Sequence, residues 1–288
     1  MAIVPFKDKV QLTRVCYEGL IAQELDQIEL LIVLADNNSM QAETHAWLQS
    51  LPASPLPHVT VRTVRYQTPF NFSYLNNRAL RDFSSFSADV VAFINNDIEF
   101  THLSIIKDLS RIAMSSSEVG AVGCTLLYPD RRIHHLFIYV GSKIVGSHPL
   151  RGKTYHPSSP WFRNIREVPG ITGAVMFVRA DDFQAVGGFD ETLATSYQDF
   201  DLCLKLQKLG RKNQTVPYVV NVHHETQTRP TEINWEEAVY AHRKWGRFLG
   251  QNPSIPRVYS RLSENLVPGI PWLDQHLSFL RATPIQCN

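Results

Sequence analysis

The sequence lacks the features that mark a membrane-spanning, secreted or nucleic-acid-binding protein. Its longest apolar runs, such as 30–35 and 90–94, are far shorter than the roughly 20 residues that a membrane helix needs. The start shows no charged stretch followed by an apolar core, so we expect no signal peptide. The 28 lysines and arginines nearly balance the 27 aspartates and glutamates, which leaves no basic surface for nucleic acid. We therefore expect a cytoplasmic protein, which could still act as a peripheral protein at a membrane surface.

Cysteine is scarce as well. The four cysteines stand far apart and form no C-x-x-C pair: Cys16, Cys124, Cys203 and Cys287. A disulfide framework or a structural zinc site is therefore not expected, and a reducing compartment fits this usage.

What the chain has is ordinary globular composition and a regular alternation of patterns. Of its 288 residues 44% are hydrophobic. In the first half, short apolar runs at 2–5, 29–35, 58–64 and 89–94 alternate with helical patterns at 12–22, 41–51 and 73–83. This alternation is typical of βαβ units. It predicts an α/β fold with a mostly parallel central sheet and flanking helices.

The second half is less regular. Strand patterns occur at 119–127, 133–140, 174–179 and 218–222, and helical patterns at 200–209 and 236–249. The segment 142–163 is rich in glycine, proline, serine and histidine, which predicts a long loop. After 249 three prolines precede an apolar stripe at helical spacing, formed by Trp272, Leu273, Leu277 and Leu280. We interpret 250–288 as a C-terminal extension that packs on the rest of the chain or docks to a partner subunit or to the membrane, with packing or a protein partner favoured because few basic residues flank the stripe.

Acidic and amide side chains follow two of the predicted buried strands. Asp36 ends the second strand, and Asn95-Asn96-Asp97-Ile98-Glu99 follows the fourth. Ligands of open α/β sheets bind at the carboxyl ends of the strands, so Asp36 and Asp97 should both reach the cleft. Asp97 is a candidate metal ligand, and Asp36 could accept a hydrogen bond from a ring N–H of a base. The alternative interpretation is a pair of solvated turns that cap the following helices.

Two later clusters carry further candidates. Asp199 and Asp201 stand at the start of an amphipathic helix, where they could cap the helix or act as a base. His223 and His224 follow a predicted strand, and an imidazole there can bind a metal or serve as a hydrogen-bonded structural residue. The pair at 134–135 is interpreted as structural or as part of an acceptor site.

These blocks together resemble glycosyltransferase family 2 enzymes of the GT-A fold, in particular the bacterial branch that builds O-antigen, capsule and other surface polysaccharides. Similar segments cover nearly the whole chain, from residue 3 to about residue 246. They are, in order, PFNFSYLNN at 69–77, FINNDIE at 93–99, VGAVG at 119–123 with LLYPD at 126–130, TGA at 172–174, VGGFDE at 186–191, DFDLC at 199–203 and HHE at 223–225.

The resemblance implies a fold, a reaction and a division of the chain. Residues 1–249 would form a GT-A catalytic domain, with a nucleotide-binding half at 1–100 and an acceptor and catalytic half at 101–249. Such enzymes transfer a hexosyl or rhamnosyl group from a nucleotide diphosphate sugar to an acceptor hydroxyl and invert the anomeric centre. The donor would be a UDP- or dTDP-sugar and the acceptor a saccharide or lipid-linked saccharide. Since the chain begins at its first strand, it could be one module of a longer enzyme, with a partner subunit or neighbouring domain.

Carried over by position, the resemblance also implies residue roles. Pro5, Asp36, Asn77 and Asn96 would contact the donor. Asp97, Glu99 and one of His223 and His224 would bind Mg²⁺ or Mn²⁺. Asp199 would be the catalytic base, with Asp201 and Gln198 in supporting positions. Gln198 departs from the glutamate that many relatives carry before the base, which could alter the properties of Asp199.

Two other hypotheses stay open from the sequence. A sugar nucleotidyltransferase shares the α/β plan, but it normally carries a glycine-rich basic loop after the first strand, which 5–8 lacks. A non-catalytic GT-A-like scaffold or binding module would be favoured if Asp97 or Asp199 pointed away from the cleft.

Overall fold

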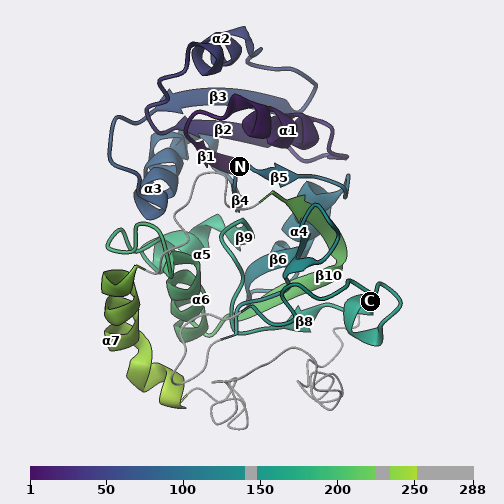
Figure 1. The fold of residues 1–288 in the computed structure, drawn as a ribbon, viewed down its shortest axis with the longest axis vertical. Coiled ribbons are helices and arrows are strands. Elements are labelled where there is room, and N and C mark those ends of the chain that lie inside the picture. The colour runs from purple at the N-terminus through teal and green to yellow at the C-terminus, as the bar shows by residue number, and fades with distance from the viewer. Residues whose placement is uncertain (140–147, 225–233, 252–288) are drawn as a thin grey trace.

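The computed structural model describes residues 1–139, 148–224 and 234–251 (Figure 1). The first half contains β1 (Ala2–Phe6), α1 (Val10–Ile21), β2 (Leu30–Asp36), α2 (Ala42–Ser50), β3 (Val59–Arg65), α3 (Phe72–Asp82), the short 3-10 helix η1 (Ser84–Phe86), β4 (Val90–Ile94) and β5 (Ile98–Glu99). The second half contains α4 (Ile105–Met114), β6 (Val119–Leu127), β7 (Ile133–His135), η2 (Pro160–Arg163), β8 (Arg166–Glu167), β9 (Val175–Arg179), α5 (Ala180–Ala185), α6 (Gln198–Lys208), β10 (Lys212–His223) and α7 (Trp235–Gln251).

One large mixed sheet organises the described residues, in the order β3-β2-β1-β4-β9-β6-β10-β5, with β7 beside β6 and β8 beside β10. The pairs among β3, β2, β1 and β4 are parallel, as is β6 with β10. Strand β9 runs antiparallel to β4 and β6. The predicted α/β class with a largely parallel sheet is therefore confirmed, and the regular βαβ part lies in the first half.

Strands β1, β2 and β4 are buried on both faces because helices cover both. Successive side chains of a strand point to opposite faces of the sheet, so alternate residues of β1 and β2 belong to two different hydrophobic cores. One core joins Val4 and Ile32 to α1, α2 and α4, and the other joins Ile3 and Val33 to α3, α5 and α6. This two-sided burial explains why these strands have continuous apolar sequences.

The parallel strands end together, and this brings the predicted polar residues to one edge of the sheet. Phe6 of β1 is in register with Asp36 of β2, and Ile3 is in register with Phe93 of β4. Asp97 follows three residues after β4 ends at Ile94. Asp36 and Asp97 therefore flank the carboxyl end of β1, as the sequence predicted.

Three predicted elements differ in extent. The strand expected at 133–140 is limited to β7, and the strand expected at 218–222 is the end of the 12-residue β10, which is irregular between Val216 and Val220. Proline at 217 interrupts the pattern there, because it cannot donate to the ladder. The predicted loop at 142–163 is packed over its last residues, where Phe162 is buried in the core. The apolar stripe at 272–280 lies outside the described residues.

In the part of the chain that the structure describes, no helix combines the length and apolar character needed to cross a membrane. Three of the four cysteines are described, at 16, 124 and 203, and all three are buried and free.

The Gly187-Gly188 turn offers a test of the packing around α3. Both glycines have positive φ angles, 77° and 67°. A Cβ at Gly188 would lie 2.7 Å from Asn77 Oδ1 and 3.1 Å from the Phe183 ring, whereas a Cβ at Gly187 would meet nothing within 4 Å. We expect Gly187→Ala to cost about 1 kcal/mol of unfolding free energy from backbone strain alone, and Gly188→Ala clearly more. Urea denaturation of both variants measures this difference, and equal losses would contradict it.

Candidate active site

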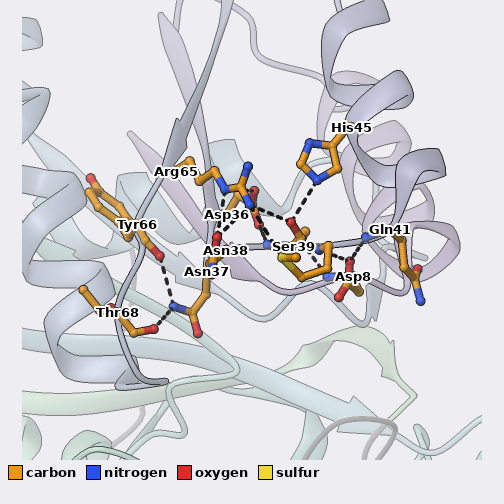
Figure 2. A network of polar contacts seen from close by, with 11 residues as sticks. Asp8, Asp36, Asn37, Asn38, Ser39, Gln41, His45, Arg65, Tyr66 and Thr68 are labelled. Atoms are coloured by element: carbon orange, nitrogen blue, oxygen red, sulfur yellow. Dashed lines mark hydrogen bonds and ion pairs between the residues drawn. The ribbon is translucent and has the colours of Figure 1, made fainter.

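The Asp36 carboxylate is held at the end of β2 by the loop that follows it. Asp36 is almost fully buried, and its Oδ1 accepts a hydrogen bond of 2.7 Å from the Ser39 backbone N–H. Ser39 Oγ in turn accepts from the backbone N–H of Asp8, after β1 (Figure 2). The Asp8 carboxylate accepts from the backbone N–H groups of Met40 and Gln41. The loops after β1 and β2 therefore hold each other in place.

Arg65 closes this network from β3. Its guanidinium donates to Asn38 Oδ1 and to the Ser39 carbonyl (Figure 2), and its Nε lies 3.9 Å from Asp36 Oδ2. Asn38 has a φ of 56°, a left-handed conformation that asparagine tolerates. Among the described residues, Asp36 Oδ2 thus lies near the Arg65 guanidinium without a hydrogen bond to it, and it can accept a hydrogen bond from another group.

The central feature of the site is the contact between Asp97 and His223. Strand β10 runs antiparallel to β5, with His223 in register with Ile98, and the His224 backbone N–H donates to the Asp97 carbonyl at 3.0 Å. His223 Nε2 lies 3.0 Å from Asp97 Oδ1, and the two side chains are only 7% and 12% exposed. Burial by itself would raise the pKa of the Asp97 carboxyl, but the hydrogen bond and charge of His223 outweigh it and lower this pKa below its usual value.

The second predicted pair is more exposed. His224 Nε2 lies 2.8 Å from Glu99 Oε2, with 30% of the His224 side chain and 45% of the Glu99 side chain exposed. The structure therefore brings all four predicted metal ligands together, but as two separate pairs. Within the described residues, no three histidine, cysteine or acidic side chains are grouped so that they could hold a metal ion by themselves.

Asp199 is linked to the Asp97 loop through the segment 172–174. Asp199 lies in the first turn of α6, and its Oδ2 accepts a 3.0 Å hydrogen bond from the Gly173 backbone N–H. The next residue, Ala174, accepts from the Asn95 backbone N–H at 2.9 Å. Gly173 is also crowded, since an added Cβ would lie 3.2 Å from the Phe72 ring. Segment 172–174 thus joins the candidate base to the candidate metal loop, a role that its sequence did not reveal.

The two predicted supporting residues behave differently. Asp201 is fully buried, and its carboxylate contacts Trp245 Nε1 at 2.7 Å, Lys244 Nζ at 2.7 Å and Lys205 Nζ at 3.1 Å. It therefore joins α6 to α7, which lies beside it in Figure 1, and none of these three contacts involves Asp199. Gln198 is buried, and its Oε1 has no hydrogen-bond partner among the described residues.

Glu237 of α7 holds the loop that leads to Asp199. Glu237 is only 6% exposed. Its carboxylate accepts hydrogen bonds from the backbone N–H groups of Ala194, Thr195 and Ser196 and from the Thr195 hydroxyl. The sequence-based interpretation missed this residue, because Glu236 and Glu237 look alike at the exposed start of a helix.

This difference between neighbouring glutamates is testable. In Glu237→Gln the amide group replaces one acceptor oxygen with a donor facing three N–H groups, so we expect a loss of about 2 kcal/mol of unfolding free energy. Glu236→Gln is the matched control, since Glu236 is exposed and should change stability by less than about 0.5 kcal/mol. Urea denaturation compares the two, and equal midpoints would show that the Glu237 contacts do not stabilise the loop.

The remaining predicted donor contacts are placed as follows. Pro5 is buried in β1, in register with Ala35. Asn96 Nδ2 donates to Thr13 Oγ1 of α1 at 3.0 Å. Asn77 is buried in α3, its Oδ1 accepts from the Phe189 N–H, and its Nδ2 donates to the Phe189 carbonyl and to Glu191. Both ends of the Asn77 amide are therefore occupied within the protein.

Two cavities are lined by other residues. One, of about 530 Å³, is lined by side chains that include Thr101, Tyr155 and Tyr218, and the other, of about 320 Å³, by Met1 and Arg179 among others. Neither of the two is lined by Asp36, Asp97 or Asp199. The candidate site is thus defined by its side-chain contacts and its position at the sheet edge.

Comparison with known proteins agrees with this architecture. No family profile matches the chain. The chain is 32% identical over 251 residues to the O-antigen biosynthesis protein RfbC of Myxococcus xanthus, which covers 84% of this chain and 19% of RfbC. It is 26% identical over 212 residues to an N-acetylglucosaminyl-diphospho-decaprenol L-rhamnosyltransferase of Mycobacterium tuberculosis, covering 67% of this chain and 66% of that enzyme.

Two solved structures show the same fold. The mannosyltransferase PcManGT of Pyrobaculum calidifontis, in complex with GDP-Man and Mn²⁺, matches with a TM-score of 0.54 and 16% identity over 96% of this chain and 78% of its own. GalNAc-T7 with UDP, GalNAc and Mn²⁺ matches with a TM-score of 0.59 and 14% identity over 98% of this chain and 54% of its own.

The fold is therefore that of the GT-A glycosyltransferases. The relatives of the chain include a protein named for O-antigen biosynthesis and one named as a rhamnosyltransferase, which agrees with the resemblance seen in the sequence. The chain spans about a fifth to a quarter of the two longer relatives that it matches, RfbC (19%) and an uncharacterized protein, y4gI, of Sinorhizobium fredii (27%, at 30% identity over 84% of this chain).

Proposed function

We propose that this chain is a metal-dependent, inverting glycosyltransferase domain that transfers a sugar from a UDP- or dTDP-sugar to the hydroxyl of a saccharide or lipid-linked saccharide. The observation that carries the proposal is the arrangement at one sheet edge. Asp36 at the end of β2, Asp97 in the turn between β4 and β5, His223 at the end of β10 and Asp199 at the start of α6 all lie there. Each of these groups suits one requirement of the reaction.

Donor recognition is assigned to Asp36. With Oδ1 held by Ser39, the Oδ2 atom is left to accept a hydrogen bond from a base. Uracil and thymine offer a ring N–H that an acceptor can take, whereas cytosine offers a bare nitrogen at the same ring position. This difference makes Asp36 a selector for uridine or thymidine nucleotides.

The metal is assigned to Asp97 and His223. A carboxylate and an imidazole are suitable ligands for Mn²⁺, and one or two protein ligands are enough when the diphosphate completes the coordination. PcManGT and GalNAc-T7 are each described with Mn²⁺, which supports the choice of metal. When bound, the metal would neutralise negative charge on the departing diphosphate. Glu99 and His224 follow Asp97 and His223 closely in the chain, so they could also contribute to metal binding.

The base is assigned to Asp199. The backbone N–H groups of Gly173 and Phe200 each donate a hydrogen bond to one oxygen of Asp199, which favours a single orientation of the carboxylate. Asp199 would take the proton of the acceptor hydroxyl while that oxygen attacks the anomeric carbon from the side opposite the diphosphate. A single displacement of this kind inverts the anomeric centre. The name of the mycobacterial relative includes a lipid-linked saccharide, which supports an acceptor of that class.

Ligand-induced thermal stabilisation tests this proposal directly. With Mn²⁺ present, we expect saturating UDP or dTDP to stabilise the protein by about 2 kcal/mol or more, as ligand at 100 times its dissociation constant does, and CDP to give much less. In Asp36→Asn the preference for UDP over CDP should disappear. Asp26→Asn, which changes an exposed aspartate on the α1–β2 loop, is the matched control. Equal stabilisation by UDP and CDP in the unmodified protein would contradict the role of Asp36.

The screen should then extend to sugar nucleotides. Hydrolysis or transfer with a UDP- or dTDP-sugar, lost in EDTA, is the expected outcome. Binding of the nucleotide without any turnover on a panel of saccharide and lipid-linked acceptors would favour the non-catalytic alternative.

A further inference from the structure

Both ring nitrogens of His223 face a polar group. Its Nε2 faces Asp97 Oδ1 at 3.0 Å, and its Nδ1 faces His134 Nδ1 at 3.0 Å. Both histidines are buried, with 5% exposure for His223 and 6% for His134. The contact joins residues 89 positions apart, one on β10 and one on β7.

The facing Nδ1 atoms restrict where the protons can be. A hydrogen bond between two ring nitrogens needs one donor and one acceptor. A metal ion takes the lone pair of a neutral imidazole nitrogen, so His223 can bind a metal through Nε2 only if its proton is on Nδ1. In that state His134 Nδ1 must be the acceptor, and the proton of a neutral His134 must be on Nε2.

The surroundings hold His134 in this position. Its ring centroid lies 4.6 Å from the Tyr128 ring and 4.6 Å from the His223 ring. The neighbouring His135 is engaged elsewhere, with Nδ1 at 2.8 Å from His148 Nδ1 and Nε2 accepting from the Thr172 backbone N–H. Among the described histidines, His134 is thus the partner that the geometry supplies to His223.

We propose that His134 is a positioning residue, which accepts a hydrogen bond from His223 Nδ1 and so keeps His223 Nε2 available as a metal ligand beside Asp97. The inference rests on the proposed metal-dependent function, and it adds a residue of β7 to a site otherwise built from the β4–β5 turn and β10. Hydrogen-bond partners of ligating histidines commonly act in this way.

The test uses two substitutions that differ in one property. Asparagine at 134 can still accept a hydrogen bond, whereas leucine cannot. We expect His134→Leu to weaken Mn²⁺ binding in the presence of UDP by about 10- to 100-fold, and His134→Asn to weaken it by less than about 3-fold. His102→Leu is the matched control, since His102 pairs with Asp108 and contacts neither Asp97 nor His223. Electron paramagnetic resonance of free Mn²⁺ measures the affinities.

A spectroscopic measurement on the unmodified protein complements the variants. In ¹⁵N–¹H correlation spectra recorded with Mg²⁺ and UDP, we expect the His223 proton on Nδ1 and the His134 proton on Nε2. A His223 proton on Nε2 in that state, or a His134→Leu variant that binds Mn²⁺ as tightly as the unmodified protein, would overturn the inference.

The Mn²⁺ affinities of the variants distinguish a wrong metal site from a wrong role for His134. If His223→Ala and Asp97→Asn both left Mn²⁺ affinity unchanged, the proposed metal site would be wrong, and the role of His134 with it. If those two variants lost affinity and His134→Leu did not, only the role of His134 would be wrong.

Discussion

Asp97→Asn should lower Mn²⁺ affinity and turnover by at least about 100-fold, because the change removes the anionic ligand but keeps the shape of the side chain. The His223 contact to Asp97 Oδ1 can be kept by the amide oxygen, so the fold should survive. Turnover as a function of Mn²⁺ concentration and Mn²⁺ binding in the presence of UDP both measure the effect. EDTA should abolish the activity of the unmodified protein.

Glu99→Gln is the informative control for Asp97. Glu99 pairs with His224 in a more exposed position, so we expect this variant to lose less than about 10-fold in Mn²⁺ affinity. The same comparison between His223→Ala and His224→Ala identifies the ligating histidine, which we expect to be His223. Full activity of Asp97→Asn in the presence of a chelator would contradict the metal assignment.

Asp199→Asn should lower turnover by about 10²- to 10⁴-fold, the scale on which loss of a general base is felt. The asparagine oxygen can still accept the Gly173 hydrogen bond, so the start of α6 should keep its position. Stabilisation by UDP and Mn²⁺ should be nearly unchanged, because Asp199 acts on the acceptor. Single-turnover kinetics with saturating donor separates the chemical step from binding.

Asp201→Asn is the matched control, since Asp201 is two residues away on the same helix but anchors Trp245 and Lys244. We expect it to lose stability, and to keep most of its turnover per folded molecule. A near-normal turnover for Asp199→Asn together with a large loss for Asp201→Asn would exchange the two roles.

The fold and the edge that carries the site could be predicted from local sequence. The runs at 30–35 and 90–94 are apolar without interruption, and strands covered on both faces have that pattern. Because the carboxyl ends of parallel strands meet at one edge, the positions of Asp36 and Asp97 after two such runs were enough to predict that both lie at that edge. The extent of β7 and β10 could not be predicted, since the irregularity near Pro217 depends on how β10 meets β6.

Side-chain partnership was decided by the tertiary structure alone. Asp199 and Asp201 lie on the same helix two residues apart, yet one accepts from Gly173 and the other is buried under α7. Glu237 and Glu236 are equally ambiguous in the sequence. The reason is physical: these hydrogen bonds join residues 26 to 89 positions apart, and local periodicity reports which face of an element is buried but not which distant group meets it. The sequence by itself determined the strands, the polar residues that follow them and the type of chemistry that these residues suit. The packing of β7, β10 and α7 determined which groups each aspartate and each histidine contacts.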